Sequence, residues 1–274
     1  MSERRIDCHA HVIDHRRFPF DDGPGYKPRP DEEGPVERYR AVLDENGVQH
    51  ALLVQPSCYG TNNAAMLDAI RGDRRRFKGI AMVEPGWGDK RLRQLADDGI
   101  VGTRLNLVVY KPDAVAAALA AGLFDRLKAI DWFVQVFATD EQWAAIAEPL
   151  RRSGVRLLID HFGTMGPDEA ARSPGFQAVL ALGREGRAAI KLSAPFRHSR
   201  TGHPYEDLEP VAAAILDAFG VAGCVWGSDW PFLNLDPRPD YGQALAALSR
   251  WVPDAADRDR VLWANPVRLF GFAG

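Results

Sequence analysis

The sequence has no excess of charge, few cysteines and no long apolar stretch, and each absence excludes a class of protein. Its 274 residues carry a formal net charge of -3, which provides no basic field for nucleic acid. No apolar stretch approaches the ~20 residues of a membrane-spanning helix, and the first residues contain no hydrophobic region of a signal peptide. Three cysteines, an odd number, are expected to be free thiols. We therefore expect a cytoplasmic protein that binds neither nucleic acid nor membrane.

Low-complexity tracts and internal repeats are also absent. A hydrophobic share of 46% and a charged share of 26% are ordinary for a folded globular protein. The length fits two modest domains or one large one, and α/β barrels commonly reach this size as one domain. We expect a single domain over residues 1–274.

Apolar runs and helical patterns alternate along the chain. Strands are predicted around residues 6–12, 51–55, 77–83, 101–107, 132–137, 155–160, 188–192 and 223–227, and helices at 36–45, 62–71, 89–97, 113–130, 140–152, 174–185 and 205–219. Nearly continuous apolar strands are typical of a parallel sheet that is covered by helices. The pattern predicts a (β/α)8 TIM-like barrel. A doubly wound open sheet is the alternative, but no glycine-rich phosphate fingerprint follows the first strand.

Polar residues follow the predicted strands consistently, at the end of a barrel where active sites lie. They are His9 and His11, Gln55, Ser57 and Cys58, Arg104 and Asn106, Gln135, Asp160 and His161, Lys191, Ser193 and Arg197, and Ser228 and Asp229. The proline-rich segment between His15 and Gly34 is expected to be a lid or a wall of the site, from which Tyr26, Lys27 and Arg29 could reach a ligand. The alternative is a mobile surface loop.

Asp229 is the strongest candidate for a general base. It lies between Trp226 and Trp230, whose indoles are expected to shield the carboxylate and raise its pKa. His9 and His11 point the same way from one strand. Together with His161 they could stabilise an oxyanion, directly or through a metal. The alternatives are that Asp229 caps the following loop and that the paired histidines are merely solvated.

Arg104 and Arg197 indicate an anionic small-molecule ligand. Two guanidinium groups at the mouth of an apolar barrel suit the bidentate capture of carboxylate. Either arginine could instead form a structural ion pair with Asp160 or Glu84. Cys58 has no adjacent activating base and is a poor candidate for a nucleophile.

These residues resemble the amidohydrolase superfamily, and within it the branch of pyrone-dicarboxylate hydrolases and related lactonases. The resemblance rests on residues 7–11 (DCHAH), 55–60 (QPSCYG) with Asn63, 102–106 (GTRLN), 160–163 (DHFG), 226–231 (WGSDWP) and 265–270 (NPVRLF). It implies a distorted barrel that opens a lactone in the breakdown of aromatic compounds. The implied base is Asp229, with His9, His11 and His161 around the carbonyl. Arg104 and Arg197 would bind substrate carboxylates, and Tyr26 would line the pocket, with Ser57, Asn106 and Gln135 as further substrate-binding candidates.

Two departures from this branch concern the substrate. Where the pyrone-dicarboxylate enzyme has a further arginine after the fourth strand, this chain has Val109, Tyr110 and Lys111. Where that enzyme has a tyrosine on the fifth strand, this chain has Phe137. Since loops set specificity on this fold, the resemblance implies the reaction class more firmly than the substrate.

No tightly bound metal is favoured. Metal-dependent members of the superfamily commonly add a histidine on the fifth strand or a lysine on the fourth, where this chain has Gln135 and Arg104. If a metal such as one zinc is bound, the expected ligands are His9, His11 and Asp229. The alternatives to a lactonase are a metal-dependent decarboxylase or C–C hydrolase, and a barrel that binds an anion without catalysis. The sequence predicts no oligomeric state.

Overall fold

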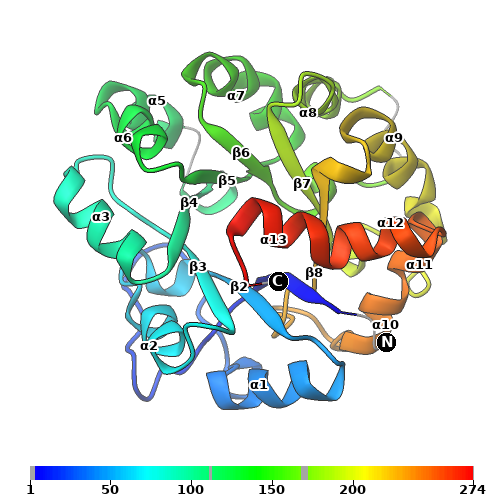
Figure 1. The fold of residues 1–274 in the computed structure, drawn as a ribbon, viewed down its shortest axis with the longest axis horizontal. Coiled ribbons are helices and arrows are strands. Elements are labelled where there is room, and N and C mark those ends of the chain that lie inside the picture. The colour runs from blue at the N-terminus through cyan, green and yellow to red at the C-terminus, as the bar shows by residue number, and fades with distance from the viewer. Residues whose placement is uncertain (1–3, 111–112, 168–171, 274) are drawn as a thin grey trace.

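The computed structural model describes residues 4–110, 113–167 and 172–273, and its centre is a sheet of eight parallel strands (Figure 1). The strands are β1 (Ile6–Ala10), β2 (His50–Val54), β3 (Phe77–Ala81), β4 (Ile100–Asn106), β5 (Phe133–Phe137), β6 (Arg156–Ile159), β7 (Ala188–Ser193) and β8 (Cys224–Gly227). They are hydrogen-bonded in chain order, and the chain after β8 returns to β1: the backbone N–H of Asp229 donates to the carbonyl of His9 at 2.7 Å. The predicted (β/α)8 barrel is confirmed.

Most of the helices surround the barrel on its outside, and α13 crosses one end of it (Figure 1). They are α1 (Val36–Glu45), α2 (Ala64–Gly72), α3 (Asp89–Asp97), α4 (Leu107–Tyr110), α5 (Asp113–Ala120), α6 (Leu123–Ala129), α7 (Asp140–Ser153), α8 (Pro174–Arg184), α9 (Glu209–Phe219), α10 (Tyr241–Ala246), α11 (Leu248–Trp251), α12 (Ala255–Asp259) and α13 (Asn265–Phe270). Within the described ranges, none of these helices has both the length and the apolar character that crossing a bilayer requires.

Two helix predictions differ from the structure. The helix predicted at 113–130 is interrupted between α5 and α6, because Gly122 adopts a left-handed φ of 65° that favours glycine. The helix predicted at 205–219 begins only at Glu209, with Pro210 in its first turn and a short 3-10 turn before it. The helices α4 and α10 to α13 were not predicted.

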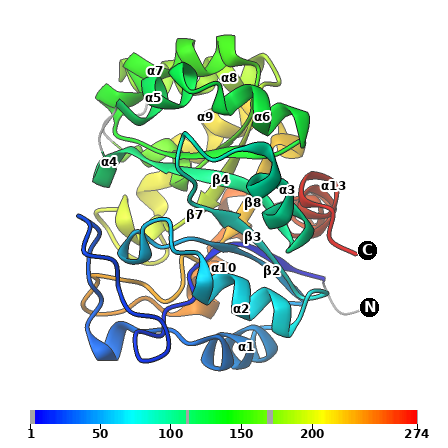
Figure 2. The ribbon, with the colours of Figure 1, turned by 90° about the vertical axis from the view of Figure 1, so that its left-hand side faces the viewer.

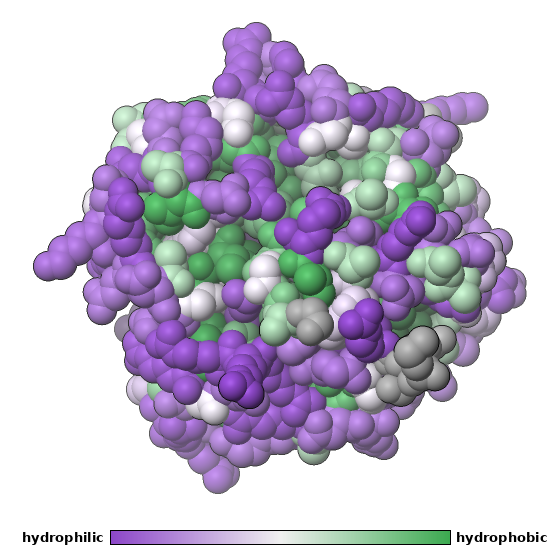
Figure 3. Space-filling view, in the orientation of Figure 1, coloured by the Kyte–Doolittle hydropathy of each residue, from purple (hydrophilic) through white to green (hydrophobic). Residues whose placement is uncertain are grey.

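The apolar core has two parts. Side chains on the outer face of the sheet pack against the helices, while Cys8, Leu52, Leu158 and Val225 belong to a second cluster inside the barrel. Phe270 joins this inner cluster, so α13 closes the end of the barrel where the strands begin. Seen from that end, the surface is mostly hydrophilic with smaller hydrophobic areas between (Figure 3).

The two ends of the barrel carry different structures (Figure 2). Both chain termini and α13 lie at one end. The long segment after β1, the helix α4 and the segment after β8 gather at the other end, where the strands finish. The chain therefore places its longest irregular segments around the strand ends that carry the polar residues.

Candidate active site

Three imidazoles and one carboxylate converge at the C-terminal ends of β1, β6 and β8. Oδ1 of Asp229 lies 3.7 Å from Nε2 of His9, 3.6 Å from Nε2 of His11 and 3.7 Å from Nε2 of His161. All four residues are buried. The structure thus brings together the four residues that were predicted to be catalytic.

Close contact between β1 and β8 holds these residues in place. A Cβ atom at Gly227 would lie 2.7 Å from Cβ of His9, so only glycine allows the two strands to approach this closely. Asp7 adds a polar link, because its carboxylate accepts from the backbone N–H groups of His9 (3.0 Å) and Ser228 (2.9 Å). The hydroxyls of Tyr39 and Tyr241 also donate to Asp7, at 2.8 and 2.9 Å.

A second buried network lies beneath the imidazoles. The ammonium of Lys191 lies 3.2 Å from Oδ1 of Asp160 and donates to Oε1 of Gln135 at 2.7 Å. The amide of Gln135 in turn donates to Oδ2 of Asp160 at 3.0 Å. Burial raises the pKa of Asp160, but Lys191 and His9 outweigh it, so this pKa lies well below its ordinary value. Asp160 is therefore a buried anion that organises its neighbours.

A cavity of about 270 Å³ opens beside Asp229. Its lining includes Tyr26, Ser57, Arg104, Asn106 and Arg197 from the predicted substrate-binding set, together with His11, Pro56, Val109, Phe137, His161, Asp229, Leu233 and Asn234. Gln135, which was predicted to bind substrate, is not in this lining, because its amide is engaged by Lys191 and Asp160 below.

The segment between His15 and Gly34 forms part of the cavity wall. Tyr26 lines the cavity and donates from its hydroxyl to Glu32 at 2.6 Å. Glu32 is fully buried and accepts from the backbone N–H of Asn234 at 3.0 Å, which joins this segment to the one after β8. Lys27 and Arg29 are absent from the lining and contact Gly23 and Glu32 instead.

Both arginines contact protein carboxylates as well as the cavity. Arg104 donates to the carbonyl of Gln55 at 3.3 Å and lies 3.5 Å from Oδ2 of Asp160, so the predicted alternative of an ion pair is present. Nε of Arg197 donates to Oδ2 of Asp229 at 2.5 Å, and a second nitrogen donates to the carbonyl of Leu233 at 3.1 Å. Each guanidinium group is thus held by its own protein partners where it lines the cavity.

The expectation of a raised pKa at Asp229 is wrong. Burial raises this pKa, but Arg197 and the imidazoles of His161, His11 and His9 outweigh burial and hold it well below its ordinary value. The indoles of the two flanking tryptophans pack on tyrosine rings. Trp230 stacks on Tyr39 at 4.7 Å, and Trp226 meets Tyr241 edge-on. Asp229 is therefore ionised and ready to accept a proton at neutral pH.

The ring nitrogens of the histidines differ in their partners. Nδ1 of His11 lies 2.8 Å from the carbonyl of Val54, which can only accept, so this nitrogen carries a proton. Nδ1 of His161 lies 2.8 Å from the hydroxyl of Ser193. Burial lowers the pKa of His161 to about 4, so its ring is neutral at pH 7. Burial and the nearby Lys191 lower the pKa of His9 well below its usual value.

Sequence reasoning did not assign roles to several residues of the site. Asp7 and Lys191 stand inside apolar runs, where a charged residue signals a buried partner. The sequence therefore indicated that Asp7 and Lys191 have buried partners, but it did not show which residues these partners are. Cys58 is buried, and burial raises the pKa of its thiol to about 12, so it remains a poor nucleophile.

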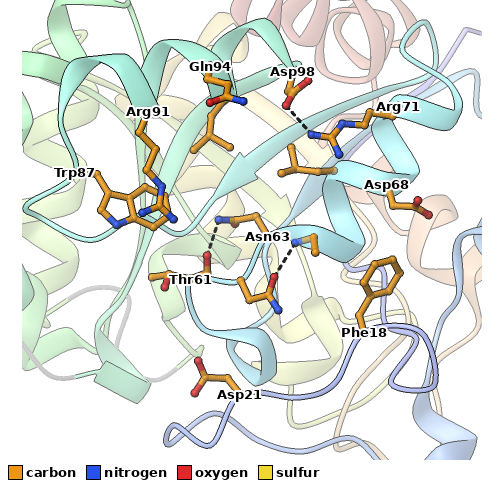
Figure 4. A pocket seen from close by; sticks show the side chains of 14 residues that line it. Phe18, Asp21, Thr61, Asn63, Asp68, Arg71, Trp87, Arg91, Gln94 and Asp98 are labelled. Carbon is orange, nitrogen blue, oxygen red and sulfur yellow. Dashed lines mark hydrogen bonds and ion pairs between the residues drawn. The ribbon is translucent and has the colours of Figure 1, made fainter.

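A wider hollow of about 640 Å³ lies elsewhere, between α2, α3 and the segment after β1 (Figure 4). Its charged side chains are largely paired. Arg71 contacts Asp98 at 2.8 Å, and Arg91 stacks on Trp87. It contains none of the residues predicted for catalysis, so the smaller cavity beside Asp229 is the better candidate site.

Among the described residues, two groups of side chains could hold a metal ion. His9, His11 and Asp229 form one, and His9, Asp160 and His161 form the other, with ligand atoms within 4.8 Å of one another in each group. Imidazole and carboxylate are both ordinary ligands of zinc. Both groups need His9, so the protonation of its ring decides whether either can bind a metal.

Known proteins are similar to this chain over nearly its whole length. Residues 6–272 match the family model described as amidohydrolase. A 4-sulfomuconolactone hydrolase of Rhizobium radiobacter is 30% identical over 97% of this chain and 89% of its own length. A 2-pyrone-4,6-dicarboxylate hydrolase of Comamonas testosteroni is 28% identical over 97% of this chain and 89% of its own length.

Solved structures agree with these relatives. A probable 2-pyrone-4,6-dicarboxylic acid hydrolase from Acinetobacter baumannii, with citric acid bound, superposes with a TM-score of 0.87 at 30% identity. The match covers 98% of this chain and 99% of that one.

Proposed function

This chain belongs to the amidohydrolase family, and we propose that it is a lactonase that hydrolyses a lactone carrying a carboxylate group. The observation that carries the proposal is the convergence of three imidazole Nε2 atoms on one oxygen of Asp229, at 3.6 to 3.7 Å. The relatives that act on sulfomuconolactone and pyrone dicarboxylate support a cyclic ester as the substrate. We also propose that the protein acts in the cytoplasm, in the breakdown of aromatic compounds.

The carboxylate requirement follows from the charge of the cavity. Arg104 and Arg197 both line it, and guanidinium groups recognise carboxylate through two parallel hydrogen bonds. Val109, Phe137 and Leu233 add an apolar part of the wall, which suits the ring of the substrate. The proposed substrate is thus a small anionic ring compound.

The proposed reaction begins with Asp229, which accepts a proton from water as the water oxygen attacks the lactone carbonyl. The carbonyl oxygen becomes an oxyanion that N–H groups of the imidazole cluster stabilise. The ester C–O bond of the ring then breaks, and the protonated Asp229 returns its proton to the leaving oxygen. Water is consumed, and the product is an open chain with a new carboxylate.

We propose that this reaction needs no metal. The ammonium of Lys191 lies 3.1 Å from Nδ1 of His9. An ammonium can only donate, so this contact leaves the ring proton of His9 on Nε2, where a metal would have to bind. The residues present therefore do not fit a metal at His9.

A lactone panel tests the function. The purified protein is offered carboxylate-bearing lactones and their neutral methyl esters, and ring opening is followed by proton release. We expect the acids to react with kcat/KM at least tenfold above that of the esters, with activity unchanged after exhaustive chelation. Equal rates on acid and ester would refute the anionic substrate. Activity that chelation abolishes and stoichiometric zinc restores would favour the metal-dependent alternative instead.

A further inference from the structure

Lys191 is a buried cation that the proposed reaction does not use directly. Its side chain extends from β7 into the barrel and is fully buried. Nζ lies 2.7 Å from Oε1 of Gln135, 3.1 Å from Nδ1 of His9 and 3.2 Å from Oδ1 of Asp160. Lys191 is not part of the cavity lining, so any effect on the substrate must pass through another residue.

The hydrogen-bonding capacity of Lys191 constrains His9. An ammonium has three donors and no acceptor, and a buried charge needs its donors satisfied. The three atoms around Nζ supply three acceptors only if Nδ1 of His9 is an unprotonated nitrogen with a lone pair. Oδ1 of Asp160 also lies 3.2 Å from this nitrogen and could accept a proton from it. In that arrangement, the N–H group at Nδ1 of His9 would face the N–H groups of the Lys191 ammonium, and donors that face one another repel.

The other contacts of Asp160 favour the first arrangement. Its Oδ2 already has the Gln135 amide at 3.0 Å and Arg104 at 3.5 Å as donors, and its Oδ1 is paired with the charge of Lys191 at 3.2 Å, so the carboxylate is stabilised without a proton from His9. The Gln135 amide turns its oxygen to Lys191 and its nitrogen to Asp160, as expected when Lys191 is the donor. A neutral imidazole carries one ring proton, which must then be on Nε2.

We infer that Lys191 is a positioning residue that fixes His9 in the Nε2–H tautomer, so that His9 presents a hydrogen-bond donor and not a metal ligand to the active site. Nε2 of His9 is buried, has no hydrogen-bond partner among the described residues and lies 3.7 Å from Oδ1 of Asp229. His11 differs at the other ring nitrogen, because its Nδ1 donates to the carbonyl of Val54.

This inference deepens the proposed lactone hydrolysis and rests on it for the role of the donor. The Nε2–H group of His9 would point to Oδ1 of Asp229, 3.7 Å away, so that His9 orients the base although it is not itself part of the cavity lining. Without the ammonium, Asp160 becomes the remaining partner of Nδ1 of His9. The tautomer would then reverse, and Nε2 would become a third ligand beside His11 and Asp229.

The direct test is the tautomer itself, measured in the unmodified protein. Histidine-labelled protein is studied by ¹⁵N NMR, and the His9 signals are assigned by their loss in His9→Gln. We expect a protonated Nε2 and an unprotonated Nδ1. A protonated Nδ1 overturns the inference. Because no substrate is involved, this result is independent of whether the protein hydrolyses lactones.

Lys191→Met provides a second test, with Lys78→Met as the control, since Lys78 is also a lysine on a strand but lies near Phe272 outside the site. Zinc binding is measured by calorimetry. Lys191→Met should bind zinc about 10- to 100-fold more tightly than the wild type, and Lys78→Met should not. Equal zinc affinity in a folded Lys191→Met and the wild type would overturn the inference.

Kinetics on an accepted lactone separate a positioning role from a purely structural one. Lys191→Met should lower kcat by about 10- to 100-fold, as loss of a residue that orients a catalytic group does, with KM nearly unchanged. A rise in KM at unchanged kcat would contradict the assigned role. If no lactone reacts with the wild type, the proposed function fails while the NMR result still decides the tautomer.

Discussion

At the scale of single residues, the proposed chemistry depends on a carboxylate that is buried among positive charge and N–H groups. Asp229 is only 3% exposed, and Arg197 lies 2.5 Å from one of its oxygens. Its low pKa makes Asp229 a weaker base than an isolated buried carboxylate but keeps it ionised at neutral pH. The contribution of Asp229 to catalysis would therefore depend more on its negative charge and its position than on its strength as a base.

Asp229→Asn should lower kcat by about 100- to 10,000-fold, because an amide cannot take the proton of the attacking water. Asp236→Asn, an exposed acid on the same segment, is the matched control and should retain wild-type activity. The measurement is steady-state kinetics on a lactone that the wild type opens. Retention of more than a tenth of the wild-type kcat/KM by Asp229→Asn would rule out its role as the base.

Arg104→Lys should weaken substrate binding, since an ammonium cannot reproduce the planar two-point contact with carboxylate. The expected cost is about 1.5 to 3 kcal/mol, which raises KM by about 10- to 150-fold. Arg126→Lys is a suitable control, because Arg126, like Arg104, donates to backbone carbonyl groups but lies outside the cavity. An unchanged KM for the acid in Arg104→Lys would mean that Arg104 serves only its ion pair with Asp160.

At the scale of elements, the close contact between β1 and β8 depends on the carboxylate of Asp7. This fully buried carboxylate accepts from two backbone N–H groups and from the hydroxyls of Ser228, Tyr39 and Tyr241. The tyrosines belong to α1 and α10, so one side chain connects two strands and two helices. Burial raises the pKa of Asp7, although the hydrogen bonds from Ser228 oppose this effect.

Tyr39→Phe should lower the free energy of unfolding by about 1.5 to 3 kcal/mol, because a buried carboxylate loses a donor. Tyr59→Phe is the comparison: its hydroxyl accepts from the backbone N–H of Asp14, a neutral partner, and its loss should cost about 1 kcal/mol. Urea unfolding of both variants checks the difference. An equal loss of unfolding free energy in the two variants would show that the charge of Asp7 adds nothing to the contact between β1 and β8.

The strands and most helices were predictable because each has a local cause. The helix Val36–Glu45 has the predicted bounds, and the eight apolar runs all became strands. The break at Gly122 was not predicted, since glycine adopts left-handed φ only where the surrounding structure requires it. At the site, strand alternation was enough to bring His9 and His11 together. The pKa of Asp229 was not predictable, because it depends on Arg197, a neighbour 32 residues away in the chain.

At the scale of the whole molecule, buried ionisable groups at the strand ends connect the stability of the barrel to pH. His161 has a pKa of about 4 in the folded protein, against the ordinary 6.5 of a histidine, chiefly because of burial. Asp160 and Asp229 have pKa values below the ordinary 3.8 despite burial, because of the surrounding cations and imidazoles. The histidine and the carboxylates therefore act in different pH ranges.

The free energy of unfolding should fall as the pH is lowered from about 6.5 to about 4. Above 6.5 the His161 ring is neutral in both states, so it contributes no pH dependence. Between 6.5 and 4 the unfolded chain binds a proton that the folded protein excludes, which corresponds to about 3 kcal/mol lost by pH 4. The contribution of Asp160 and Asp229 is present above 3.8 and is lost only at lower pH, so it does not overlap this range.

Urea unfolding of the wild type and His161→Gln between pH 7.5 and pH 4.5 isolates this effect, with the exposed His203→Gln as the control. His161→Gln should lose less stability than the wild type over this range, since glutamine does not titrate, whereas His203→Gln should follow the wild type. Part of the pH dependence should remain in His161→Gln, because the pKa of His9 is also lowered, by burial and by Lys191. The same pH dependence in all three proteins would mean that His161 is protonated as easily in the barrel as in the unfolded chain.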